Sequence, residues 1–79
     1  KQKTFSYTIK IADFYFKDSA KLMVKRIKEE TKVNKAQIMN ISNTTFRVFL
    51  GPYNNLNSLQ KAFNDISRID FENIELIKQ

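Results

Sequence analysis

The sequence predicts an α+β fold whose elements follow one another in the order β-α-β-β-α-β. The first observation is an internal repeat, in which Ile9–Phe14 matches Val48–Tyr53, aliphatic against aliphatic and ring against ring. The second is a change of period in each half, from the alternation typical of a strand to the spacing typical of a helix. The third is the length of 79 residues, which is that of one small domain.

Two strands are predicted where apolar and polar residues alternate, because alternation puts one set of side chains on each face of a sheet. The sets are Tyr7, Ile9 and Ile11 against Thr8, Lys10 and Ala12 in one strand, and Phe46, Val48 and Leu50 against Thr45, Arg47 and Phe49 in the other. Shorter strands are expected after each helix, around Gln37–Ile41 and Asn73–Lys78, where apolar residues occur on both parities.

A first helix is predicted between Asp18 and Thr31, because apolar residues recur at positions 20, 23, 24 and 27. Asp18 or Ser19 is the expected N-cap, since a short side-chain oxygen accepts hydrogen bonds from the unpaired amides of the first turn. The side of this helix away from the apolar stripe carries Lys21, Lys25, Arg26 and Lys28. We interpret it as a solvated surface.

A second helix is predicted from about Leu56 to Arg68, with Asn54 or Asn55 as its N-cap. Its inward-facing residues are expected to be Leu59, Ala62, Phe63 and Ile66. The complete order of elements is that of a ferredoxin-like sandwich. Right-handed crossovers then place both helices on one face of a four-stranded antiparallel sheet and leave the other face uncovered. We expect a linker stub over residues 1–4, a single domain over residues 5–79, and any function on the uncovered face.

The composition argues against several kinds of site. The chain has no Cys and no His, so it lacks the thiolate and imidazole groups on which most metal sites and nucleophile–base pairs depend. The nearest group of carboxylates, Asp65, Asp70 and Glu72, is placed around a helix end and a turn, where such groups are usually solvated. Gly51 is the single glycine, so there is no glycine-rich phosphate loop. We expect no enzymatic activity, no metal and no cofactor, and no apolar run approaches the ~20 residues of a transmembrane helix.

The formal net charge of +6 comes entirely from the first half of the chain. Much of that excess belongs to the first helix, on the side opposite the uncovered sheet face, so nucleic acid is not the expected partner. On the uncovered face, the positively charged side chains are expected to be Lys10 and Arg47. Arg47 beside Phe49 offers hydrogen-bond donors next to a ring, which suits a flat polar ligand such as a nucleobase or a sugar. The same two side chains also fit a cross-strand packing pair, and the sequence leaves both interpretations open.

Two segments resemble the characteristic motifs of SPOR (sporulation-related repeat) domains. Tyr7–Phe14 is similar to their opening strand, which reads aromatic, any, Val, Gln, aliphatic, Gly, small, Phe. Phe46–Tyr53 is similar to their second motif, aromatic-Arg-Val-x-aliphatic-Gly-Pro-aromatic. A predicted helix follows each motif, so the resemblance covers the chain from about Phe5 to Lys78.

The resemblance implies a bacterial module of the periplasm or cell envelope. Such modules bind peptidoglycan glycan strands that have lost their peptide stems, and they target the parent protein to the septum or cell wall. They usually end longer envelope proteins, including cell-division proteins and lytic transglycosylases of the rare lipoprotein A type, which can be outer-membrane lipoproteins. The open sheet face and its neighbouring loops bind the glycan. By position, the family's functional residues correspond to Lys10, Asp13, Thr45 and Arg47.

The motifs also depart from the family pattern. Lys10 replaces the usual Gln, Ala12 the usual Gly, and Thr45 has no ring where some members have Trp. We expect Phe49 or Tyr15 to supply the missing aromatic surface. Lys10 retains the ability to donate to sugar hydroxyls or to the lactyl carboxylates that stripped strands expose.

Two alternatives remain open at this level. RRM-type RNA-binding domains share the predicted fold, but their third strand carries two or three rings where this chain has Phe49. A protein-interaction domain, which pairs through an exposed sheet edge, is the other. For the glycan-binding module we expect a monomer.

Overall fold

The computed structural model describes residues 5–71 and 73–78 and confirms the predicted order of elements. They are β1 (Tyr7–Phe14), α1 (Lys17–Glu30), β2 (Ala36–Ser42), β3 (Thr45–Tyr53), α2 (Leu56–Ile66) and β4 (Glu75–Lys78). The predicted linker stub, residues 1–4, lies outside the described residues.

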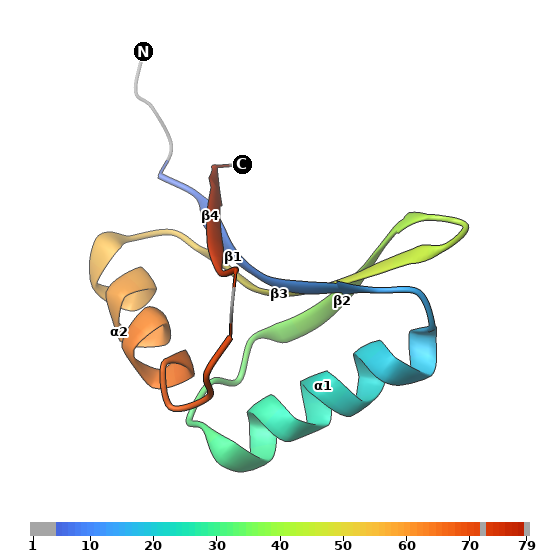
Figure 1. The fold of residues 1–79 in the computed structure, drawn as a ribbon. Helices are drawn as coiled ribbons and strands as arrows, with labels where there is room; N and C mark the ends of the chain where they lie inside the picture. The colour runs from blue at the N-terminus through green and yellow to red at the C-terminus, as the bar shows by residue number, and fades with distance from the viewer. Residues whose placement is uncertain (1–4, 72, 79) are drawn as a thin grey trace.

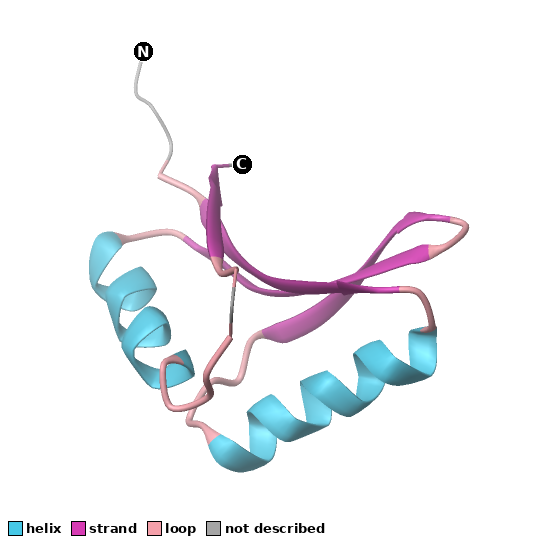
Figure 2. Cartoon of the chain, in the orientation of Figure 1, coloured by secondary structure: helices cyan, strands magenta, loops and turns pink. Residues whose placement is uncertain are grey.

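The four strands form one antiparallel sheet in the order β2-β3-β1-β4. Both helices lie on the same side of this sheet, below it in Figure 1, and in the described part of the chain the other side carries no helix (Figures 1 and 2). β1 and β3 are the central strands, and β2 and β4 form the edges. This is the predicted α+β arrangement, and it is consistent with a ferredoxin-like sandwich.

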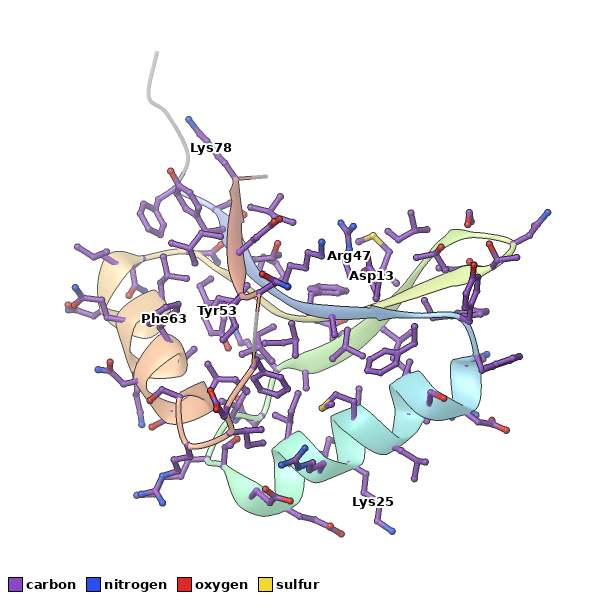
Figure 3. The ribbon with its side chains drawn as sticks, in the orientation of Figure 1. Asp13, Lys25, Arg47, Tyr53, Phe63 and Lys78 are labelled. Atoms are coloured by element: carbon purple, nitrogen blue, oxygen red, sulfur yellow. The ribbon has the colours of Figure 1, made fainter. Side chains whose placement is uncertain are left out.

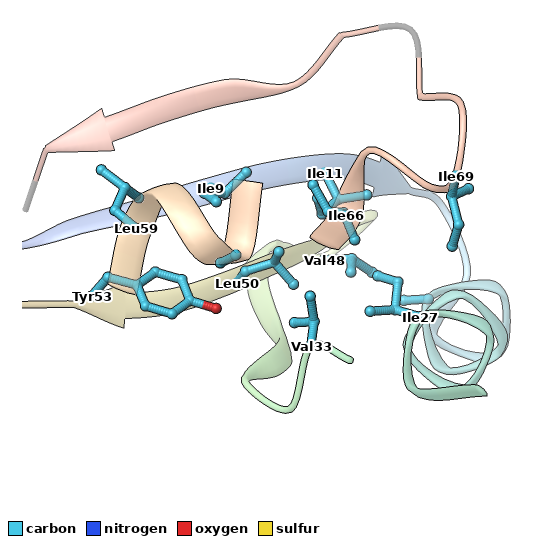
Figure 4. Packing of buried hydrophobic residues seen from close by; sticks show 12 residues of the cluster. Ile9, Ile11, Ile27, Val33, Val48, Leu50, Tyr53, Leu59, Ile66 and Ile69 are labelled. Atoms are coloured by element: carbon cyan, nitrogen blue, oxygen red, sulfur yellow. The ribbon is translucent and has the colours of Figure 1, made fainter. Parts of the chain in front are cut away.

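The hydrophobic core fills the space between the sheet and the helices (Figure 4). Ile9 and Ile11 of β1 and Val48 and Leu50 of β3 face it and are at most 2% exposed. The rest of the buried cluster comprises Ala20, Ile27, Val33, Tyr53, Leu59, Ala62, Ile66 and Ile69. Complete burial of one such aliphatic side chain contributes roughly 1.5–3 kcal/mol, so this cluster is the main favourable term in folding.

The start of α1 differs from the prediction. Its N-cap is Phe16, in an extended conformation and without a side-chain hydrogen bond to the first turn. Asp18 and Ser19 lie inside the helix, so the prediction that one of them is the cap is wrong. Asp18 nevertheless places a negative charge near the free amides of the first turn, where the helix dipole makes it favourable.

The start of α2 agrees with the prediction, because the Asn55 side chain accepts a hydrogen bond from the Ser58 amide at 2.8 Å. The helix ends at Ile66, two residues before the predicted end. There the Ser67 hydroxyl donates to the Asn64 carbonyl at 2.6 Å and so provides a hydrogen-bond partner for one of the carbonyls at the end of the helix.

One inward-facing residue of α2 was placed wrongly. Leu59, Ala62 and Ile66 are buried as predicted, whereas Phe63 is 44% exposed. The buried stripe of this short helix is narrow, and Phe63 falls at its margin. It lines an open hollow of about 460 Å³ between α2 and β4, together with Leu56, Leu59, Gln60, Asn64 and Leu76.

β1 contains a bulge that changes the faces of its last residues. Lys10 pairs with Phe49, but the next pair along the ladder joins Ala12 to Val48, so β1 has one extra residue at this point. Alternation is reversed beyond it: Ala12 packs toward the core, and Asp13 reaches the uncovered face. The prediction that Ala12 lies on the uncovered face is therefore wrong, because strict alternation ends at a bulge.

The end of β3 depends on the single glycine of the chain. Gly51 has a φ of 110°, and its peptide bond to Pro52 is cis. A Cβ at this position would lie 3.0 Å from Cδ2 of Tyr53. Positive φ and the lack of space both favour glycine here.

Candidate functional site: a charge cluster on the uncovered sheet face

Four charged side chains meet on the uncovered face, where the central strands adjoin β4. They are Lys10 and Asp13 of β1, Arg47 of β3 and Glu75 of β4, which we call the charge cluster. Figure 3 shows Asp13 and Arg47 on the side of the sheet away from the helices, whereas Lys25 of α1 points away from the sheet on the far side. Two cations and two carboxylates balance, so the cluster is formally neutral in a chain that is strongly basic.

Asp13 and Arg47 form a two-point ion pair. Arg47 Nε donates to Oδ1 of Asp13 at 2.8 Å, and Nη2 donates to Oδ2 at 3.1 Å. The bulge makes this pairing possible because it places the two residues directly opposite each other on one face. The side chains are 31% exposed for Asp13 and 25% for Arg47, so the pair is open to a ligand from solvent.

The ion pair also fixes the protonation of both groups. The hydrogen bond from Arg47 holds the pKa of Asp13 below its ordinary value, against the opposing effect of burial, and nearby Lys10 adds to the lowering. The same hydrogen bond raises the pKa of Arg47, with burial again opposing. Both groups are consequently charged over the ordinary pH range.

Lys10 links the two carboxylates of the cluster. Its ammonium lies 3.8 Å from Oδ2 of Asp13 and 3.9 Å from Oε1 of Glu75. These distances are too long for direct hydrogen bonds, so Lys10 is held mainly by charge and keeps donors for a ligand.

Phe49 lies in the middle of the same face but is only 9% exposed. Its neighbours across the two ladders are Lys10 of β1 and Gln37 of β2. The ring is not displayed as an open surface in this structure, which favours the packing interpretation of Phe49 over a stacking platform.

Thr45 and Tyr15 lie at one end of the charge cluster. The last β1–β3 pair joins Phe14 to Phe46; Thr45 is the neighbouring residue of β3, and Tyr15 is the first residue after β1. Tyr15 is 74% exposed and its ring centroid lies 6.4 Å from that of Phe16, which is also exposed. The six predicted site residues thus follow the β1–β3 ladder: Lys10, Asp13, Arg47 and Phe49 lie together, and Thr45 and Tyr15 at its end.

Sequence reasoning missed three residues of this face. Glu75 joins the charge cluster from β4, and Gln37 and Met39 stand beside Phe49 and Arg47 on β2. Their short strands have apolar residues on both parities, so no pattern in them specified a face. Only the pairing of β4 with β1 and of β2 with β3 specifies which face these three residues occupy.

A hollow of about 420 Å³ adjoins the charge cluster. It opens where β4 stops, since β4 pairs with β1 only from Tyr7 to Lys10. Its lining residues are Lys10, Ile11, Ala12, Asp13, Met23, Arg26, Asp70, Phe71 and Asn73. A ligand on the cluster therefore has at its side a recess that is lined by both polar and apolar residues.

Among residues 5–71 and 73–78, no three carboxylates are grouped so that they could hold a metal ion. Neither α1 nor α2 has the length and apolar character needed to cross a membrane.

Comparison of the chain with protein-family models, with curated proteins and with solved structures gives no match.

Proposed function

We propose that this domain is a non-catalytic module that binds peptidoglycan glycan strands stripped of their peptide stems, and that it does so as a monomer. The observation that carries the proposal is the Asp13–Arg47 pair, held at two points on an uncovered sheet face beside Lys10, with the exposed Tyr15 following directly after the end of β1. The SPOR-like motifs contribute its main residues.

The pair supports sugar binding because it offers fixed donors and acceptors together. Arg47 uses two of its N–H groups on Asp13, and the others remain for a ligand. The carboxylate of Asp13 also keeps unused lone pairs. Neighbouring hydroxyl and acetamido groups of an amino sugar need such alternating partners, and a side chain already held in place loses little entropy when it binds them.

Tyr15 is the aromatic residue that suits contact with a sugar ring. Its side chain is exposed, and it stands at the same end of the ladder as Thr45, where some SPOR domains carry Trp. A ring at this position would pack on the apolar face of one sugar while the charge cluster binds polar groups of the next.

RNA binding is not favoured by the observed face. RRM-type recognition needs exposed rings on the central strands, and Phe49 is buried. The charge cluster is also formally neutral, and Lys25 of α1 points away from the sheet on the opposite side of the molecule (Figure 3).

The cellular setting follows from the same proposal. The domain would act in the periplasm or cell envelope of a bacterium, as the targeting module of a longer protein such as a division protein or a lytic transglycosylase of the rare lipoprotein A type. Enzymatic activity would belong to that parent protein.

Sedimentation with cell-wall sacculi tests the proposal. The domain should sediment with amidase-treated sacculi and much less with untreated ones. Arg47→Ala should weaken this binding by about tenfold, the effect of removing a charge-assisted hydrogen-bond donor. Lys25→Ala, which removes the same charge from the far side of the molecule, should bind like the natural sequence. Equally poor retention on both kinds of sacculi, or equal binding by the two variants, would contradict the proposal.

A further inference from the structure

We propose that Asp13 is a built-in competitor, whose carboxylate occupies the place where the domain would otherwise hold a carboxylate of its ligand. This inference rests on the proposed function and specifies the ligand group: the lactyl carboxylate that a glycan strand carries wherever a peptide stem has been removed. Asp13 is then a specificity-determining residue that limits binding through charge.

The geometry around Asp13 is that of a filled carboxylate site. Both of its oxygens accept from the Arg47 guanidinium, at 2.8 and 3.1 Å, and the Lys10 ammonium lies 3.8 Å from Oδ2. A guanidinium fork with a second cation beside it is the arrangement with which proteins bind carboxylates from solution. The two cations of the charge cluster are thus both directed at a carboxylate of the chain itself.

Stability alone is a weak reason for this arrangement. Both partners are about a quarter to a third exposed, and ion pairs open to water contribute little to folding. The ladder also departs from regular pairing at this point. If alternation continued unbroken through the same residues, Asp13 would face the core and the guanidinium of Arg47 would have no carboxylate partner in β1. The bulge brings a competing negative charge to Arg47.

As a consequence, the uncovered face should bind the neutral groups of a sugar and bind anionic groups only weakly. A ligand carboxylate must displace Asp13 from Arg47 or remain in water. The natural domain should therefore bind stripped strands mostly through hydroxyl and acetamido groups, with little dependence on their charge. Release of Arg47 should turn the same face into a carboxylate receptor.

The test compares three neutralising substitutions that change the net charge equally. Asp13→Asn removes the competitor, Glu75→Gln removes the other carboxylate of the charge cluster, and Asp18→Asn removes one on α1 that has no part in the cluster. The ligands are stripped glycan strands and the same strands whose lactyl carboxylates have been converted to methylamides. Dissociation constants are measured by calorimetry, and thermal melts verify that each variant is folded. Asp13→Ser serves as a second variant, since Asn can still accept from Arg47.

We expect the natural domain and Asp18→Asn to bind the charged and amidated strands within about a factor of two of each other. Asp13→Asn should prefer the charged strands by about tenfold, the worth of a charge-assisted two-point contact. The preference of Glu75→Gln for charged strands should lie between these two values, because this substitution makes the local charge more positive without freeing the guanidinium of Arg47. Substitution of Arg47 by Gln in the Asp13→Asn background should abolish the preference. The inference is overturned if Asp13→Asn and Glu75→Gln show the same preference, or if the natural domain already prefers charged strands tenfold.

A failure of the proposed function would look different. No variant would then bind either form of the strands. The role of Asp13 is still measurable in that case on carboxymethyl-cellulose, a polysaccharide that carries carboxylates. Asp13→Asn should elute from it at higher salt than Glu75→Gln, and co-elution of these equally charged variants would overturn the inference.

Discussion

The two halves of the molecule, β1-α1-β2 and β3-α2-β4, use one sequence pattern and differ most at their strands. Their helices bury equivalent residues, since Ile27 of α1 and Ile66 of α2 are both fully buried. β3 keeps its alternation from Phe46 through Leu50, whereas β1 loses it at the bulge after Lys10. The repeat thus determines what enters the core, and an irregularity in one half determines what reaches the uncovered face.

Other equivalent positions also diverge. Val24 packs against the core, but its counterpart Phe63 is 44% exposed. Ile38 pairs with Val48 on the helix side, whereas its counterpart Ile77 pairs with Thr8 on the other. A repeated residue type is therefore a reliable guide to structure only where both halves pack against the same neighbours.

The largest expected effect concerns the position at which the halves agree. Ile27→Ala and Ile66→Ala should each lower the free energy of unfolding by about 2–5 kcal/mol, because both leave a cavity in a fully buried site. Urea unfolding measures both values. Phe63→Ala is the control and should cost clearly less than either. A small effect of one isoleucine substitution alone would show that the halves are not equivalent even in the core.

A middle-sized effect should separate the two helix starts. Asn55→Ala removes the side chain that accepts from the Ser58 amide, and it should cost about 1 kcal/mol. Ser19→Ala, in the half whose helix has no side-chain cap, should change stability by less than about 0.5 kcal/mol. Thermal or urea unfolding distinguishes the two, and equal losses would contradict the assignment of Phe16 as the N-cap of α1.

The smallest effect belongs to the ion pair that the bulge creates. The pKa of Asp13 is lower in the folded protein than its ordinary value of 3.8, so its contribution to stability is present above that value. This contribution is lost as the pH falls through the lowered folded pKa. Asp13→Asn should therefore show a shallower loss of stability below about pH 4 than the natural sequence, measured as urea midpoints over a pH series. Parallel curves for the two proteins would show that the pair is not formed in solution.

Most of the fold is predictable from the sequence because it depends on periodicity. The alternation of Ile9 and Ile11 and the spacing of Leu59, Ala62 and Ile66 each identify a buried face without knowledge of the rest. The cap at Asn55 is a local signal of the same kind. The N-cap at Phe16 gives no such signal. The start of α1 has no side-chain hydrogen bond, so no capping residue type marks it in the sequence.

The site is predictable only in part, because it depends on register. Lys10, Asp13 and Arg47 were identified from the motifs, but their mutual contact requires an extra residue in β1 that alternation alone does not indicate. Glu75 enters the charge cluster through the pairing of β4 with β1, which joins residues far apart in the chain. Phe49 shows the reverse case: its face was predicted, but its burial depends on neighbours from two other strands.

The bulge in β1 also means that the number of residues in this strand, and not only their types, decides which side chains reach the uncovered face. Insertion of one residue between Ala12 and Asp13 would act as a phase shift, because every later side chain of the strand would change sides. Asp13 would then meet the apolar side of the sheet, and Arg47 would lose its partner. Deletion of Ile11 would instead remove the extra residue and leave Asp13 opposite Arg47 in a regular ladder. Related sequences that keep this ion pair should therefore lack insertions between Ala12 and Asp13, whereas the pairing tolerates loss of the extra residue.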